Sequence, residues 1–171
     1  MSAVWAGLSL KETSMNNENN PSNTDLAMKF NDHSHEASTV TAVQVPDHQR
    51  IKISSDLFGF FFPMRLEPAI YYFSETLSED YEGGLWQFYT LSNGGFYMAP
   101  EQDDPFKVSA INGFEGELSA DALGLTACLY AYSHLSFGEG KFAETCAEHY
   151  HLLLDFACEH KEAGSILRAI D

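Results

Sequence analysis

The sequence predicts a single α+β domain in which a small antiparallel β-meander packs with about four helices. Apolar residues recur at helical spacing on both sides of a central region that is rich in aromatic residues. Two Asn-Gly pairs in that region are the strongest short signals for a hairpin turn. With 171 residues, 44% of them hydrophobic, the chain has the length of one domain and enough apolar side chain to bury a core.

Residues 1–38 differ in composition from the rest and predict a flexible polar tail ahead of a domain that spans 39–171. They are rich in Asn, Ser, Thr and Glu and include the run NNENNPSN at 16–23. Such a run buries too little apolar surface to offset the entropy lost on ordering. We therefore expect the domain to fold without residues 1–37.

The domain opens with an extended stretch at 39–45, a Pro-Asp turn at 46–47 and an aromatic run, FGFFFP, at 58–63. Four apolar residues then recur at the spacing of one helix face: Leu66, Ile70, Phe73 and Leu77. This spacing predicts the first core helix.

The central region predicts an antiparallel meander. Its strands are expected at 85–92, 95–99, 106–111 and 114–118, with the turns Asn93-Gly94 and Asn112-Gly113 inside the two pairs. Five aromatic side chains on the first pair could form a stacking platform for bases: Trp86, Phe88, Tyr89, Phe96 and Tyr97. Because no cations accompany them, we expect them to pack between sheet and helices instead.

Three helices are expected after the strands. Ser119 can cap the first helix, and Asp121 in its first turn suits the helix dipole. Its apolar face comprises Leu125, Cys128, Leu129, Tyr132 and Leu135. After a glycine break at 138–140, the apolar face of the second helix comprises Phe142, Cys146, Tyr150, Leu153 and Ala157. A short last helix is expected at about 163–170.

The charge balance argues against a nucleic-acid binder. The chain has 25 acidic and 9 basic residues, a net charge of −16, and the segment 39–171 holds 20 of the acids and 7 of the bases. Binding DNA or RNA requires Lys and Arg to replace condensed counterions, so we expect no direct contact with nucleic acid. No apolar run is long enough to cross a membrane and no basic region precedes the first apolar stretch, so we expect a cytoplasmic protein.

Six acids form the candidate interaction surface: Glu115, Glu117, Asp121, Glu144, Glu148 and Asp155. The first two alternate in a predicted strand, and the last three share the polar face of a predicted helix. Such acids can serve solubility alone, or they can steer the protein toward a basic partner surface. Paired carboxylates can also do acid/base or metal chemistry, but exposed strand and cap acids are the commoner case.

The sequence lacks recognisable catalytic or metal-binding motifs. There is no G-x-S-x-G, and no Lys-Ser/Thr follows the Gly-Gly pairs as a phosphate-binding loop requires. Cys128, Cys146 and Cys158 lack C-x-x-C spacing and are expected to be small core residues. His149 and His151 are two residues apart, so they diverge on a helix. We expect no catalytic residues, no metal and no cofactor.

Three ordered strings resemble a known family. They are YEGGLWQFY at 81–89, LSNGGFYMAP at 91–100 and NGFEGELSADA at 112–122, and the chain ends in LRAID at 167–171. Together with Phe137 they closely resemble the ArdB/KlcA antirestriction family over about 45–171. The resemblance implies a small bacterial protein of plasmids and other mobile elements that relieves type I restriction-modification of incoming DNA. It implies no enzyme activity and supplies no catalytic site.

Two mechanisms of different classes follow. The protein could be a DNA mimic, whose carboxylates replace phosphates spaced about 1.7 Å along the duplex axis. Alternatively it binds a protein partner, the type I restriction-modification complex or a regulator of it, and its charge assists encounter. We favour the second, because the acids are interrupted by core residues. A third hypothesis, a carboxylate-dependent hydrolase, requires Glu115, Glu117 and Asp121 to bind a divalent ion.

Overall fold

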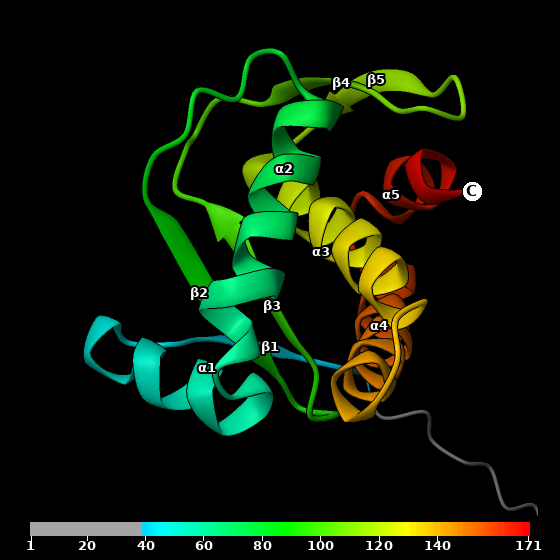
Figure 1. Cartoon of the computed structure of the whole chain (residues 1–171). Helices are drawn as coiled ribbons and strands as arrows, with labels where there is room; N and C mark the ends of the chain where they lie inside the picture. The colour runs from blue at the N-terminus through cyan, green and yellow to red at the C-terminus, as the bar shows by residue number, and fades with distance from the viewer. Residues whose placement is uncertain (1–38) are drawn as a thin grey trace, which may run out of the picture. The chain divides into compact units, whose positions relative to one another are not determined.

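The computed structural model describes residues 39–171 (Figure 1), and the polar tail expected at 1–38 lies outside the described residues. In chain order the strands and helices are β1 (Ala42–Gln44), α1 (Arg50–Phe58), α2 (Glu67–Leu77), β2 (Trp86–Leu91), β3 (Phe96–Pro100), β4 (Phe106–Ser109), β5 (Glu115–Leu118), α3 (Ala120–Ser136), α4 (Lys141–Glu159) and α5 (Ala163–Ile170). A 3-10 turn (Asp47–Gln49) precedes α1, and a π-helical turn (Phe62–Leu66) precedes α2.

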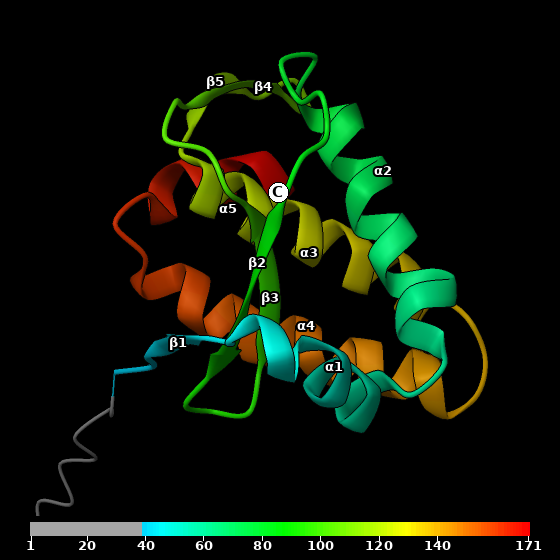
Figure 2. The same cartoon turned by 90° about the vertical axis from the view of Figure 1, so that its left-hand side faces the viewer.

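The α+β fold class predicted from the sequence is confirmed, with the strands divided into two antiparallel sheets. One sheet has the order β1-β2-β3 and the other pairs β4 with β5, so the expected meander is not continuous. The division falls between Pro100 and Pro105, which flank a short acidic segment. Pro100 still pairs with Trp86 and the Glu101 N–H donates to the Leu85 carbonyl at 2.8 Å, so the chain leaves the sheet only after Glu101. Pro105, just before β4, has no N–H to donate to a ladder. Figure 2 shows the β2–β3 hairpin in front of α3 and α4, with β4 and β5 at one end.

The predicted Asn-Gly turn joins β2 to β3. Gly94 has a φ of 91°, a left-handed conformation that glycine adopts without strain. Its N–H donates to the Leu91 carbonyl at 2.9 Å. The Asn93 side chain donates to the Leu152 carbonyl of α4 at 2.8 Å. The turn therefore ties the sheet to α4 as well as reversing the chain.

Helix α3 lies at the centre of the core. It packs against α2, α4, α5 and β3, and most of its side chains are buried. Gly124 permits the close approach to β3, because a Cβ at this position would lie 2.5 Å from the Ala99 Cα. Tyr132 adds a hydrogen bond of 3.0 Å from its hydroxyl to the Phe96 carbonyl. The five aromatic residues of the hairpin belong to this core or pack against it.

Three details differ from the sequence predictions or extend them. Helix α1 was not predicted, because Ile51 is exposed and only Ser54 and Phe58 of its side chains are buried. Cys158 is exposed, so the prediction of a core cysteine is wrong there, although Cys128 and Cys146 are buried as expected. Within 39–171, no helix combines the length and the apolar character that crossing a membrane requires.

Candidate functional site

Three of the six candidate acids lie on the outer face of α4. Glu144, Glu148 and Asp155 are exposed, and a helix with 3.6 residues per turn places them within a sector of about 40°. The opposite face of α4 buries Phe142, Cys146, Leu153 and Ala157, while Tyr150 is half-buried. The predicted apolar face thus fixes how the helix is rotated, and its acids face outward.

Glu115 and Glu117 lie on β5, where alternate side chains share one face of the strand. Both are exposed. In the antiparallel register Glu117 lies opposite Lys107, and Glu115 lies opposite Ser109. A cross-strand pair of opposite charge favours this register slightly. These two carboxylates therefore lie on the surface of the small sheet, where Glu115 borders two hollows.

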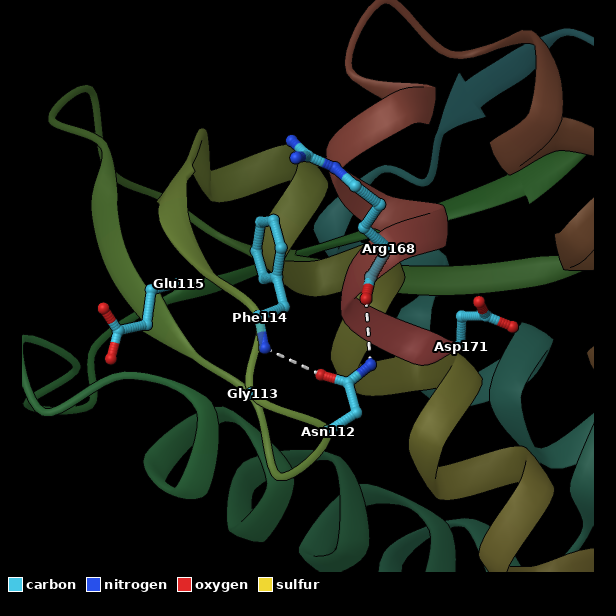
Figure 3. Close-up of a pocket in the computed structure, with 6 residues that line it drawn as sticks. All are labelled: Asn112, Gly113, Phe114, Glu115, Arg168 and Asp171. Atoms are coloured by element: carbon cyan, nitrogen blue, oxygen red, sulfur yellow. Dashed lines mark hydrogen bonds between the residues drawn. The ribbon is translucent and has the colours of Figure 1, made fainter.

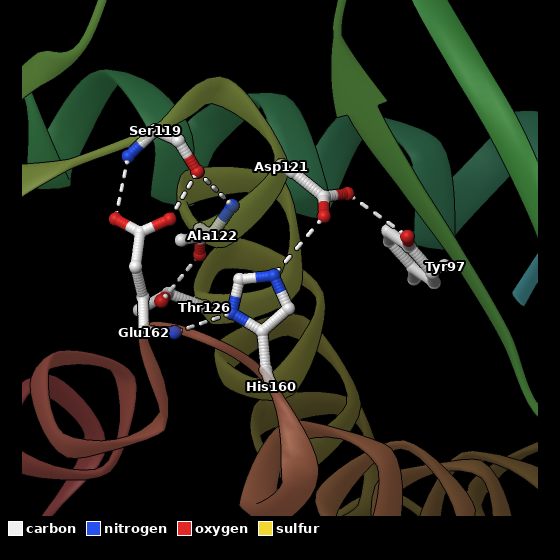
Figure 4. Close-up of polar contacts among 7 residues, drawn as sticks. All are labelled: Tyr97, Ser119, Asp121, Ala122, Thr126, His160 and Glu162. Atoms are coloured by element: carbon white, nitrogen blue, oxygen red, sulfur yellow. Dashed lines mark hydrogen bonds and ion pairs between the residues drawn. The ribbon is translucent and has the colours of Figure 1, made fainter. Parts of the chain in front are cut away.

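Asp121 has a different environment, because both of its carboxylate oxygens are hydrogen-bonded (Figure 4). The Tyr97 hydroxyl donates to Oδ1 at 2.9 Å, and His160 Nε2 lies 3.1 Å from Oδ2. Burial by itself would raise the pKa of Asp121, but the hydrogen bonds from His160 and Tyr97 outweigh it and hold that pKa below its usual value. Asp121 is therefore ionised and anchored at neutral pH.

The loop between α4 and α5 completes this polar network. The Glu162 N–H donates to His160 Nδ1 at 3.1 Å, so Nε2 carries the ring proton that faces Asp121. The carboxylate of Glu162 accepts from the N–H of Ser119 at 3.0 Å and also from the Ser119 hydroxyl. Ser119 accepts in turn from the Ala122 N–H at 3.2 Å, which confirms its predicted role as a helix cap.

Although the network contains Ser, His and Asp, its geometry is that of a structural clasp. The Ser119 hydroxyl bonds Glu162 rather than His160, so the imidazole is not placed to take its proton. Only 6% of the His160 side chain is exposed. Both ring nitrogens are already engaged. The network fastens the α4–α5 loop to the first turn of α3.

The six candidate acids do not converge on one place. Figures 1 and 2 both show β5 and α4 in separate parts of the domain, and Asp121 lies at the start of α3. Among residues 39–171, no three His, Cys, Asp or Glu side chains are grouped so that they could hold a metal ion. The grouping of Glu115, Glu117 and Asp121 on which the hydrolase hypothesis depends therefore has no geometric support.

A hollow of about 670 Å³ lies beside the second Asn-Gly turn (Figure 3). The Asn112 amide donates to the Arg168 carbonyl at 2.9 Å, and its oxygen accepts from the Phe114 N–H at 3.0 Å. The Arg168 guanidinium lies 5.2 Å from the centre of the Phe114 ring. These contacts hold α5 against the turn, so Asn112, Phe114 and Arg168 already have structural partners.

The comparisons with known proteins address the same part of the chain. A family model described as antirestriction protein matches residues 79–171, which is more than half of the sequence. The chain belongs to the antirestriction protein family. The match begins after α2 and includes both hairpins, α3, α4, α5 and the polar clasp. The resemblance inferred from the ordered sequence strings is thereby confirmed.

Similar individual proteins match about three quarters of this chain. The antirestriction protein KlcA of Escherichia coli is 42% identical over 139 residues, which are 78% of this chain and 95% of KlcA. The protein YfjX of Escherichia coli K12 is 41% identical over 136 residues, 77% of this chain and 88% of YfjX. A solved structure aligns with a TM-score of 0.73 and 41% identity, covering 77% of this chain and 95% of the other.

That solved structure comes from work on KlcA and ArdB. Those two proteins are described as having a novel fold, with antirestriction activity against type I DNA restriction systems in vivo but not in vitro. The family match at residues 79–171 covers the region that carries the clasp and the two exposed acid groups. Sequence reasoning identified Ser119 and Asp121 and placed Tyr97 in the core without its bond to Asp121. It missed His160 and Glu162, which no local motif marks.

Proposed function

We propose that this protein relieves type I restriction of incoming DNA by binding a protein partner, and that it does so without catalysing a reaction. The observation that carries the proposal is the behaviour of KlcA and ArdB, which act in vivo but not in vitro. An inhibitor that blocks the purified enzyme directly would act in both settings. Activity restricted to cells favours a partner that a purified assay lacks, such as a regulator of the restriction complex.

The distribution of charge supports protein binding over DNA mimicry. On α4, Glu148 follows Glu144 by four residues and Asp155 follows Glu148 by seven. At a rise of 1.5 Å per residue, these separations are about 6 Å and about 10 Å along the helix axis. A DNA duplex carries one charge per about 1.7 Å of its axis. The acid face of α4 is therefore too sparse to replace a phosphate backbone, but it can speed encounter with a basic protein surface.

The test is expression in cells that carry an active type I system, challenged with unmodified phage. The protein should raise phage recovery by orders of magnitude over an empty vector, whereas phage already modified by the host should plate equally on both. An unchanged recovery at good soluble expression would remove the antirestriction proposal for this chain.

A second experiment separates the mechanisms. The purified protein is added to purified type I enzyme and DNA, with and without an extract of the restricting cells. We expect protection of the DNA only when the extract is present. Protection without extract would identify the enzyme itself as the partner, and cleavage of DNA by the purified protein with Mg²⁺ would contradict the non-catalytic proposal.

A further inference from the structure

A second surface, formed by α1, the π-helical turn and β2, differs in chemistry from the acid face of α4. It contains a groove of about 680 Å³ with a largely apolar lining that includes Ile51, Phe60, Phe62, Pro63 and Phe88. Its size is in the range of about 300–1,000 Å³ found for ligand pockets. Two large apolar side chains at its rim are open to solvent: Ile51 is 84% exposed and Phe60 is 73% exposed.

The backbone beside the groove has an unusual form. The N–H of Glu67 bonds to the carbonyl of Phe62, five residues earlier, in place of the usual four. Pro63 and Pro68 both lack an N–H, which interrupts the regular helical ladder on each side. Single π-helical turns of this kind are frequent at functional sites. Met64 in this turn and Phe60 just before it are exposed, while Phe62 and Leu66 are buried.

Arg50 is held rigidly at the edge of the groove. Its Nη2 donates to Gln87 Oε1 at 2.6 Å and lies 2.8 Å from the Asp47 carboxylate. Its guanidinium carbon lies 5.4 Å from the centre of the Phe88 ring, which also lines the groove. Gln87 is itself fixed by Glu101, to which its amide donates at 2.7 Å. Among residues 39–171, Nε of Arg50 is buried and has no hydrogen-bond partner, so this cation keeps an unused donor.

The local charge indicates what the groove can accept. Residues 47–67, which supply all the lining residues of the groove except Phe88, contain three cations and three acids, whereas residues 68–171 contain four cations and seventeen acids. An acidic segment of another protein is repelled by most of this chain but not by this surface. Glu67 also lines the groove, but its carboxylate already accepts from the Tyr71 hydroxyl at 3.1 Å.

We propose that this groove binds an amphipathic segment of another protein, in which large apolar side chains enter between Ile51 and Phe60 and a neighbouring Asp or Glu meets Arg50. Aromatic residues and arginine are the side chains most often found as binding hot spots. An apolar face laid into a groove is a common mode of peptide recognition. The inference rests on the proposed function only in that the partner is a protein.

Two matched double variants test the surface. Ile51→Ser with Phe60→Ser removes the apolar rim, and Ile111→Ser with Phe137→Ser removes the same side chains at positions that are 94% and 87% exposed elsewhere. Both should melt like the wild type, since exposed side chains contribute little stability. The groove variant should lose about tenfold or more of the antirestriction activity, and the control should keep it. Equal activity in the two variants overturns the inference, while an inactive wild type counts against the proposed function instead.

Photo-crosslinking identifies the occupant without depending on antirestriction activity. A benzophenone amino acid replaces Phe60, and the adducts formed in restricting cells are mapped by mass spectrometry. We expect an adduct with a different protein, at a segment where apolar residues adjoin Asp or Glu, that is lost with Ile51→Ser and kept with Ile111→Ser. An adduct with a second copy of this chain, with its own residues 1–38 or with lipid overturns the proposal, and so does the absence of any adduct.

Discussion

Helices α3 and α4 lie against one another but obey different constraints. α3 is buried on nearly every side, and Asp121, its only acid, is hydrogen-bonded through both oxygens. α4 buries one face and presents Glu144, Glu148 and Asp155 on the other. Packing therefore determines most positions of α3, whereas the outer face of α4 is free to serve recognition. Substitutions in α3 should therefore lower stability, whereas substitutions on the outer face of α4 should change activity and leave stability nearly unchanged.

The strongest test of this division is Gly124→Ala in α3. Its new Cβ would lie 2.5 Å from both the Ala99 Cα and the Met98 carbonyl oxygen, so α3 and β3 must move apart. Overpacking typically lowers the free energy of unfolding by about 1–3 kcal/mol, and we expect a loss of about 3 kcal/mol here. Thermal or urea unfolding should show the loss.

Gly164→Ala in α5 is the matched control for Gly124→Ala. A Cβ at Gly164 meets nothing within 4 Å, and the residue lies in a helix. Alanine there should stabilise the protein by about 0.5–1 kcal/mol, because it lowers the entropy lost on folding. Equal stability of the two variants would contradict the close α3–β3 contact.

A smaller loss is expected at the hairpin that connects the sheet to α4. Gly94→Val places a β-branched side chain at a φ of 91°, which should cost about 2 kcal/mol. Gly94→Asn should cost less, since asparagine tolerates the left-handed conformation better. Denaturant unfolding of both variants measures the difference. If valine and asparagine cost the same, the backbone conformation is not what Gly94 provides.

Local signals account for the parts of the fold that the sequence predicted well. The last helix was expected at about 163–170 and is observed at Ala163–Ile170, and the cap at Ser119 and the turn at Asn93-Gly94 are present. Each of these depends on residues within a few positions of one another. Helix α1 lacks such a signal, because its apolar side chains do not share one face. The division into two sheets also depends on which strands pair, a choice that alternating patterns do not encode.

The polar clasp was less predictable, because its residues are far apart in the sequence. Asp121 and His160 are 39 residues apart, and Ser119 and Glu162 are 43 apart, so the clasp exists only once α4 has folded back along α3. Acids at 144, 148 and 155 were predictable as one stripe, because helical spacing alone places them on one face. The aromatic run at 58–63 was visible in the sequence, but the groove beside it also needs Arg50 and Phe88 from α1 and β2.

The clasp should make stability depend on acid pH. The Asp121 pKa is lower in the folded protein than its unfolded value, which is about 3.9. Its contribution is therefore complete above about pH 4 and is lost as the pH falls through the folded pKa. Asp121→Asn should be less stable than the wild type by about 1 kcal/mol at pH 7, and the gap should close below pH 4. Glu117→Gln, an exposed control, should show no such gap, and a pH-independent deficit would contradict the pKa assignment.

The smallest effect on stability, and the most informative for function, is expected on the outer face of α4. Glu144→Gln, Glu148→Gln and Asp155→Asn together should leave the free energy of unfolding within about 0.5 kcal/mol, because all three side chains are exposed. The control Glu75→Gln, Glu79→Gln and Asp103→Asn removes three exposed charges elsewhere. If the α4 acids steer a basic partner, the α4 variant should need more protein than the control for the same relief of restriction, measured across a series of expression levels. An equal loss of activity in both variants would assign the effect to net charge. A complete loss of activity in the α4 variant, with its fold intact, would point to a specific acidic contact or to mimicry.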